Sequence, residues 1–570
     1  MKRCPDSQAA QTQDVVGQYY VDYQSLDYYI KTLKDRIEEC LQHTACCKRM
    51  SGSRLPVQGS GMLPTRCLEL CGEQVFLRET GKMCGSYLTL SHRWNQDTED
   101  TRTTTENYEA RLIGVWDCTL PKLYTDVLDL AQRVGVKYVW IDSMCIIQAG
   151  DEGKDWGQEA VQMAPYYQGS LMTVMASSAT KEHGLYPEKM HSPSAVELVR
   201  LPYRDREGRR QGHFFVYRNA LSGGRQFEAS VTSSNLLSRG WVFQEYHLSR
   251  RSVYFTPHGM FFECKTQGAI NDRNEGTDRY TYFTNAWYEK YLSQYSGLHL
   301  TKPAEDRLIA LSGVMTEYLE SLAKNERERH WKPLTDGEDA NAWWRCGLWK
   351  FDLPAGLAWQ LDTRTKALPE RSSKYPSWSW ASIIAPVSWD GLVSTGGNML
   401  KNIALVYQNG HPQNRPPEAL HVEGRLLPVL VRGHFVSQRE VDVVSSLSNS
   451  EKATGPDGEA PRSTNWRKIC LPENPKLVSG WASIEHADFQ DDSVFVLSPV
   501  IYALAVSSES IRATPYAYGH LYKASTVFTV LYLRSVLGGK KYQRIGVGKV
   551  FGAAAWTTFR SSQERKLVLV

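Results

Sequence analysis

The sequence predicts an α/β fold, in which a parallel sheet flanked by helices is followed by a β-rich C-terminal domain. Three short apolar runs, at residues 87–91, 138–141 and 171–175, have the length and composition of buried strands. Segments with helical periodicity separate these runs, and such alternation with short connections favours right-handed crossovers and parallel pairing. After residue 392 the pattern changes to short strands.

The first apolar run ends in a group of polar residues. Tyr-Leu-Thr-Leu at 87–90 breaks at Ser91, and Arg93 and Trp94 follow in the next few positions. Open parallel sheets bind their ligands at the edge formed by the carboxyl ends of the strands. We therefore expect Ser91, Arg93 and Trp94 to lie at a binding site.

Two further elements are expected before this strand. Residues 1–20 show no regular pattern and are expected to be unstructured, whereas helical spacing runs from Asp22 to Cys47. An extended pair, Cys67–Leu70 and Gln74–Arg78, is then turned at Gly72. These elements would precede the parallel sheet.

A long polar segment, Asn95–Thr119, follows the strand and is expected to be a loop. A helix then begins at Pro121 and stops at Gly135, which suits the left-handed residue just past a helix end. Asp142 ends the next strand, and another helix is expected from Asp155. Asp142 is therefore a second candidate for the ligand-binding edge.

The patterns divide the chain into four parts. We expect an N-terminal helical segment and linker at 1–60, the α/β domain at 61–320, a helical and Trp-rich extension at 321–385, and a β-rich domain at 386–570. A disordered loop is expected near 445–464, where Ser, Gly and Pro are frequent.

The composition excludes several classes of protein. The 570 residues carry a net charge of only +4, with no long basic block, so nucleic acid is not an expected partner. No apolar run reaches the roughly 18 residues of a membrane-spanning helix, and the N-terminus has no signal-peptide core. We expect a soluble, cytoplasmic protein with no membrane partner.

Twelve cysteines are too few for a disulfide scaffold in a chain of this length. One group, Cys40, His43, Cys46 and Cys47, followed by Cys67 and Cys71, is a candidate metal site by residue type. Neither set has the paired Cys-x-x-Cys spacing of a zinc ribbon, so no metal is expected and the thiols are interpreted as buried small side chains.

Four blocks of sequence, taken in order and spacing, resemble the fungal heterokaryon-incompatibility (HET) domain. They are Tyr87–Trp94, Leu120–Gln148, Asp155–Tyr167 and Arg239–Glu245. Further segments that accompany this domain in larger fungal proteins resemble Phe262–Cys264, Thr301–Gly313, Gly347–Trp349 and Pro376–Trp380.

The resemblance implies a fold similar to the TIR domain of innate-immune receptors, with a flavodoxin-like parallel sheet. It also implies a role in fungal non-self recognition, where activation leads to growth arrest or cell death. Many TIR domains cleave NAD at the nicotinamide–ribose bond, with a catalytic glutamate in a Trp-x-x-x-Glu helix. Trp241 and Glu245 have this spacing, which implies that Glu245 is the catalytic residue.

The chemistry explains why a carboxylate would be needed. Cleavage of this bond passes through an oxocarbenium-like state, whose positive charge a fixed carboxylate such as Glu245 stabilises. Trp241 could wall the pocket or stack on a ring, and Arg93 or Arg239 could hold the pyrophosphate. The alternatives are a solvated or salt-bridged Glu245, core tryptophans, and an Asp142 that caps a neighbouring helix.

One block departs from the family pattern. The family usually has Ser-Tyr-x-Trp-Gly where this chain has Ser91-His92-Arg93-Trp94-Asn95. Asn95 tolerates a positive φ, but its side chain would hinder the close approach of a phosphate to the backbone. His92 is expected to be a partly exposed surface histidine.

Three functions from different classes remain open at this stage. The domain could be a TIR-like NAD hydrolase triggered by assembly, a non-catalytic signalling module, or an enzyme of a fungal biosynthetic pathway that uses the same cleft. No resident cofactor is expected, because NAD or another small molecule would be the substrate. Since no nucleotide-triphosphate loop or repeat is visible, assembly would need a protein partner or self-association.

Overall fold

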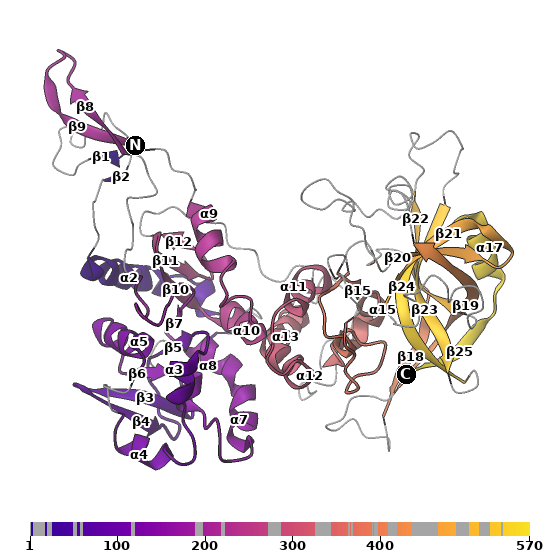
Figure 1. Cartoon of the computed structure of the whole chain (residues 1–570), viewed down its shortest axis with the longest axis horizontal. Coiled ribbons are helices and arrows are strands. Elements are labelled where there is room, and N and C mark those ends of the chain that lie inside the picture. The colour runs from indigo at the N-terminus through magenta and orange to yellow at the C-terminus, as the bar shows by residue number, and fades with distance from the viewer. Residues whose placement is uncertain are drawn as a thin grey trace. The chain divides into compact units, whose positions relative to one another are not determined.

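The computed structural model divides the chain into two compact units, Met1–Tyr282 with Ile309–Glu328 and Phe283–Leu308 with Arg329–Val570 (Figure 1). Each unit is described by itself. The described residues are 2–3, 18–19, 25–48, 54–56, 61–115, 120–187, 198–217, 223–271, 287–324, 344–362, 365, 369–389, 392, 397–407, 419–434, 466–485, 501–511, 525–536 and 540–570.

An eight-stranded mixed sheet forms the centre of the first unit, in the order β12-β11-β10-β7-β5-β6-β3-β4. The four inner strands, β10, β7, β5 and β6, are parallel, and antiparallel pairs extend the sheet at both edges. The predicted parallel core is thus confirmed. The strands are β3 (Arg66–Cys71), β4 (Gln74–Glu79), β5 (Tyr87–Ser91), β6 (Tyr138–Trp140), β7 (Met172–Met175), β10 (Arg251–Thr256), β11 (Gly259–Cys264) and β12 (Ile270–Asn271).

Helices cover the inner strands from both sides, and all five residues of β5 are consequently buried. The chain moves from β5 to β6 in one direction and returns across β5 to reach β7. Right-handed crossovers therefore place α5 (Lys122–Arg133) and α8 (Met163–Gly169) on opposite faces of the sheet (Figure 1). α10 (Gly240–Leu248) lies beside α8 and leads into β10.

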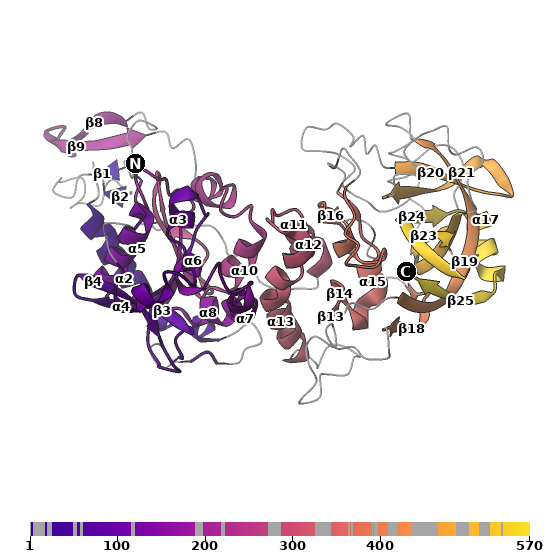
Figure 2. The same cartoon turned by 60° about the horizontal axis from the view of Figure 1, so that its bottom comes forward.

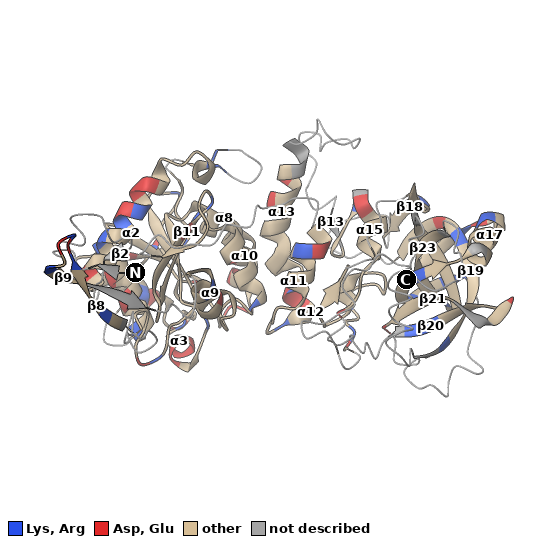
Figure 3. Cartoon of the chain, turned by 90° about the horizontal axis from the view of Figure 1, so that it is seen from above, with Lys and Arg blue, Asp and Glu red and all other residues tan. Residues whose placement is uncertain are grey.

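The predicted loop at 95–119 is wrong, because two short helices occupy much of it. They are α3 (Gln96–Asp100) and α4 (Tyr108–Ile113). Asn95 accepts a hydrogen bond from the Thr98 amide and donates its own amide to the Thr98 hydroxyl, at 3.0 and 2.8 Å. This reciprocal cap starts α3, and acidic residues of α3, visible in Figure 3, suit the positive end of the helix dipole.

The N-terminal expectations need two refinements. The predicted helix at 22–47 is α2 (Leu26–Leu41), capped by Ser25 and followed by a 3-10 turn at Ala45–Cys47. Residues 1–20 are not wholly unstructured, because β1 (Lys2–Arg3) and β2 (Gln18–Tyr19) join a small sheet with the hairpin β8 (Leu198–Arg204) and β9 (Arg210–Tyr217).

The second unit is built on a nine-stranded sheet, as the β-rich prediction required. Its longest strands enclose an apolar core that includes Ile469, Val530 and Phe559, and α17 (Ala553–Ser561) lies against the sheet (Figure 2). The predicted loop near 445–464 lies outside the described residues. The strands are β17 (Gly397–Asn398), β18 (Lys401–Val406), β19 (Ala419–His434), β20 (Trp466–Leu471), β21 (Asn474–Ile484), β22 (Ile501–Ile511), β23 (Ser525–Val536), β24 (Lys541–Phe551) and β25 (Glu564–Leu569).

A buried arginine ties this sheet to the Trp-rich segment before it. Arg544 of β24 is fully buried, pairs with Glu485 at 2.6 Å, and donates to the carbonyls of Leu357 and Trp359. Its guanidinium also lies 3.6 Å from the centre of the Trp359 ring. Trp378 is likewise completely buried.

The sequence predicts no membrane-spanning helix. Within the described ranges, each helix is too short or too polar to cross a bilayer.

α13 (Ile309–Lys324) packs against α8 and α10, and Gly313 lies at the point of contact. The Gly313 amide donates to Gln244 Oε1 at 3.3 Å. A Cβ at Gly313 would lie 2.3 Å from Ala164 Cβ and 2.6 Å from Gln244 Oε1. The close approach of α13 to the helix that carries Glu245 therefore requires glycine at this position.

We expect Gly313→Ala to lower the free energy of unfolding by about 1–3 kcal/mol, although alanine is intrinsically the better helix former by about 1 kcal/mol. Urea unfolding of the full chain measures this loss. Gly157→Ala is the matched control, because Gly157 lies in α7 (Lys154–Glu159) with nothing within 4 Å of an added Cβ. Equal effects of the two substitutions would contradict the packing argument.

Candidate functional site

The carboxyl group of Glu245 lies at the carboxyl end of β5. Glu245 is on the last turns of α10 and is only 5% exposed. It faces Ser91 at the end of β5 and the Tyr167 hydroxyl of α8, which also lies 3.3 Å from the Leu90 carbonyl. The sheet edge and two helices thus enclose one carboxyl group.

Burial controls the protonation of Glu245. Loss of hydration raises the pKa of Glu245 to about 7; the Ser91 hydroxyl and the Arg239 charge oppose this rise, and the Asp142 charge adds to it. The Ser91 hydroxyl is buried and makes no hydrogen bond of good geometry, yet it lies close enough for its dipole to favour the carboxylate. The group is therefore poised between its two protonation states near neutral pH.

Asp142 lies at the end of the neighbouring strand, β6, and begins the short helix α6 (Asp142–Cys145). The indole N–H of Trp94 donates to its Oδ2 at 3.0 Å, and the Ser143 amide donates to its Oδ1 at 2.8 Å. Its side chain remains 25% exposed. Asp142 thus keeps contact with solvent while it orients Trp94.

Arg239 and Trp241 occupy the start of α10. Arg239 is half-buried and donates to the His92 carbonyl at 2.7 Å, which joins α10 to the loop after β5. Trp241 is half-buried and meets Trp156 of α7 edge to face, with 5.8 Å between ring centres. Since Trp241 and Glu245 are four residues apart, they lie on the same side of the helix.

His92 corrects an expectation from the sequence. It is 3% exposed rather than a surface residue, because its ring packs against Tyr124 of α5 and shares a 2.9 Å hydrogen bond with the Tyr124 hydroxyl. Burial lowers the pKa of His92 to about 4, with Asp142 opposing and Arg239 reinforcing the shift. The imidazole is therefore neutral at physiological pH.

Asn95 also differs from the expectation. Its φ of −133° is an ordinary extended value, so the replacement of the family's glycine by Asn places no strain on the turn. The side chain serves as the cap of α3 instead.

Arg93 is separated from the Glu245 group. It is exposed and lines a shallow pocket of about 60 Å³ near the start of α5, far smaller than a typical ligand pocket. The other lining residues are His92, Asn95, Asp97, Thr98, Pro121, Lys122, Leu123, Ala176, Ala179, Thr180 and Lys181. Ser91, Asp142 and Arg239 thus lie close enough to Glu245 to shift its pKa, whereas Trp94 contacts Asp142 and Trp241 lies one turn before Glu245 on α10. Arg93 lines the small pocket instead.

A salt bridge from Glu245 to a nearby arginine is the alternative left open by the sequence, and three arginines close to Glu245 in sequence donate hydrogen bonds to backbone carbonyls. Arg239 donates to the His92 carbonyl, Arg250 to the Gln168 carbonyl at 2.6 Å, and Arg251 to the Leu171 carbonyl at 3.0 Å. The carboxyl faces the hydroxyl groups of Ser91 and Tyr167, and the Arg239 charge favours its ionised form. Such a group would attract a cationic ligand or a developing positive charge.

A second group of side chains lies away from this site. Cys40, His43 and Cys46 converge with Cys264 of β11, whereas Cys47 and Cys71 are exposed. Sequence reasoning weighed the first three residues and missed Cys264. The signal was the even three-residue spacing of Cys40, His43 and Cys46, but nothing local pointed to a fourth ligand more than two hundred residues away.

Comparison with known proteins gives one match. A family described as heterokaryon incompatibility protein (HET) matches residues 87–245, from the first residue of β5 to Glu245. Comparisons with curated proteins and with solved structures found no match.

The raised pKa of Glu245 has a consequence for stability. The folded carboxyl binds its proton more tightly than the unfolded one, so its ionisation destabilises the folded state as pH rises from about 4.5 to about 7. Glu245→Gln removes this effect. We expect the variant to gain about 2–3 kcal/mol relative to the parent protein between pH 5 and pH 8.

Urea unfolding at both pH values measures the gain. Glu99→Gln, on the exposed surface of α3, controls for the general loss of a carboxylate. A stability difference for Glu245→Gln that is the same at both pH values would show that folding does not raise the pKa of this carboxyl.

Proposed function

Since residues 87–245 carry a HET domain, which implies fungal heterokaryon incompatibility, we propose that this domain acts by cleaving NAD at the nicotinamide–ribose bond. The observation that carries the proposal is the Glu245 carboxyl, enclosed at the carboxyl end of a parallel strand with a pKa near 7. A carboxylate in that place is what the developing charge on the ribose requires.

The order of the parallel strands supports a TIR-like fold. Numbered along the chain, β5, β6, β7 and β10 lie in the sheet in the order 2-1-3-4, the arrangement of flavodoxin-like sheets. Glu245 and Trp241 lie on the helix between the third and fourth of these strands, at the carboxyl edge where such sheets bind ligands.

In the proposed reaction, the bond between ribose C1′ and the nicotinamide nitrogen breaks heterolytically. The electron pair passes to the pyridinium nitrogen and leaves neutral nicotinamide, while the ribose becomes an oxocarbenium ion. The Glu245 carboxylate stabilises this cation and orients the ribose hydroxyls. Water then attacks C1′ and releases a proton, which gives ADP-ribose.

The neighbouring residues supply binding. Arg239, fixed by the His92 carbonyl, binds the pyrophosphate, and Trp241 stacks on the nicotinamide ring. The Ser91 hydroxyl lies beside the carboxylate and favours its ionised form, and Asp142 holds Trp94 against the mouth of the site. Arg93 contributes from the rim. Because Glu245 is 5% exposed, substrate reaches it only after the residues around the carboxyl rearrange, a step that assembly would trigger.

A second candidate is a signalling module without catalysis. The burial of Glu245 and the 60 Å³ pocket, which Glu245 does not line, favour this alternative. In that case the carboxyl would only shape the surface that recruits partners, and NAD would be untouched.

We expect Glu245→Gln to lower NAD turnover by at least about 100-fold while the fold is retained, because the amide cannot stabilise the cation. Nicotinamide release by the purified full chain measures the effect, with Glu99→Gln as the control. Undiminished turnover in Glu245→Gln would exclude the proposed role. Cell death that persists in this variant would favour the signalling module.

The pH dependence gives an independent expectation. The carboxylate is the active form, so kcat/KM should fall about tenfold for each pH unit below the Glu245 pKa of about 7 and level off above it. His92, with a pKa of about 4, does not titrate in this range. A flat profile between pH 6 and pH 8 would be incompatible with a catalytic Glu245.

A further inference from the structure

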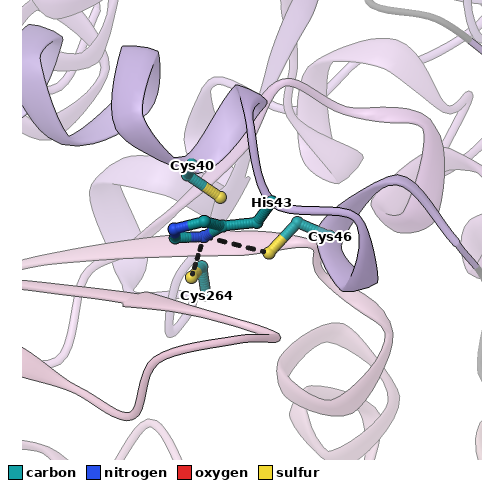
Figure 4. A group of neighbouring side chains, drawn as sticks. All are labelled: Cys40, His43, Cys46 and Cys264. Carbon is teal, nitrogen blue, oxygen red and sulfur yellow. Dashed lines mark hydrogen bonds between the residues drawn. The ribbon is translucent and has the colours of Figure 1, made fainter.

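Four metal-binding side chains meet where α2 lies against β11. Cys40 and His43 come from the end of α2 and the residues after it, Cys46 from the 3-10 turn that follows, and Cys264 from the last position of β11 (Figure 4). One donor atom from each residue lies within 4.8 Å of every other. All three thiols are 0–1% exposed.

The spacing of the donors fits a tetrahedral zinc ion. With Zn–S near 2.3 Å and Zn–N near 2.0–2.1 Å, neighbouring donor atoms of a tetrahedron are about 3.6 Å apart for S and N and about 3.8 Å for two S atoms. His43 Nδ1 lies 3.6 Å from Cys264 Sγ and 3.8 Å from Cys46 Sγ. Figure 4 shows the imidazole and the sulfurs pointing toward one common centre.

The surroundings of the three sulfurs are those of thiolates. Each sulfur has a nearby group that is able to donate a hydrogen bond to it: Arg251 Nε lies 3.1 Å from Cys40, the Thr266 hydroxyl 3.2 Å from Cys46, and the Gln267 amide 3.4 Å from Cys264. A neutral thiol in an apolar core needs no such donors. Thiolates bound to a metal are commonly supported by hydrogen bonds of this kind.

The local charge also fits. Three thiolates and a neutral imidazole around Zn²⁺ leave one net negative charge, which is costly in the interior unless it is paired. Arg251 is 1% exposed and points its guanidinium at Cys40, so it supplies the compensating charge. Its second contact, with the Leu171 carbonyl, fixes it to the residue before β7.

We propose that Cys40, His43, Cys46 and Cys264 bind a structural zinc ion that fastens α2 to the HET sheet. All four positions are filled by protein ligands, so the site has no open position for catalysis. Residues more than two hundred positions apart are joined at the strand that pairs with β10. This site shares no residue with the proposed NAD site, so the two proposals can fail separately.

Metal analysis of the purified full chain tests the proposal. We expect one zinc per chain, and expect metal-free protein to bind one Co²⁺ with the intense ligand-field and thiolate charge-transfer bands of a tetrahedral site. Cys264→Ser should lose most of the bound zinc, because it removes the ligand from β11. Cys47→Ser should keep it, since Cys47 adjoins the cluster but is exposed.

A second measurement uses the unaltered chain, so that it does not depend on how the variants fold. A chelator should open Cys40, Cys46 and Cys264 to alkylation, mapped by mass spectrometry, while Cys145, which is equally buried outside the cluster, stays protected. Absence of zinc or Co²⁺ binding, equal zinc loss in both variants, or a disulfide among the three cysteines would overturn the proposal.

Discussion

The first unit buries the Glu245 carboxyl at the carboxyl end of its central strand β5. Burial removes the hydration of the ionised carboxylate and so favours the protonated form. This raises the pKa of Glu245 to about 7. Two helices enclose this carboxyl, and a third packs against both of them. α10 carries the carboxyl, α8 supplies the Tyr167 hydroxyl, and α13 comes close to both because Gly313 has no side chain.

At the end of β5, successive side chains point to opposite faces of the sheet and therefore meet different neighbours. Ser91 faces the α8 and α10 side, where the carboxyl lies, and His92 faces α5, where it bonds to Tyr124. The two residues are adjacent in sequence, yet one helps to set the protonation of Glu245 and the other is a neutral core residue. Asp142 lies near both groups and shifts both pKa values.

Much of this arrangement could be predicted from local patterns. Apolar periodicity predicts the strands that begin at 87, 138 and 172 and the helix that starts after Pro121. Gly135 predicts where that helix stops, and its φ of +78° in the structure is the left-handed conformation expected there. The strand ends then bring Ser91 and Asp142 to one edge. The burial of His92 and the α3 cap were missed, because both depend on which tertiary neighbour a polar side chain meets. Cys264 was missed for the same reason, since a contact between residues more than two hundred positions apart has no signal in the local sequence.

The matched HET segment, 87–245, is shorter than the folded unit that contains it. The unit also contains β10 and β11, which follow the matched segment. Residues 283–308 belong to the other unit, and residues 309–328, which include α13, belong to the first unit again. During synthesis, α10 would leave the ribosome long before α13 exists to cover it. In the nascent chain, the surface of α8 and α10 around Ala164, Gln244 and Leu248 would therefore stay exposed to water until translation had passed the end of α13.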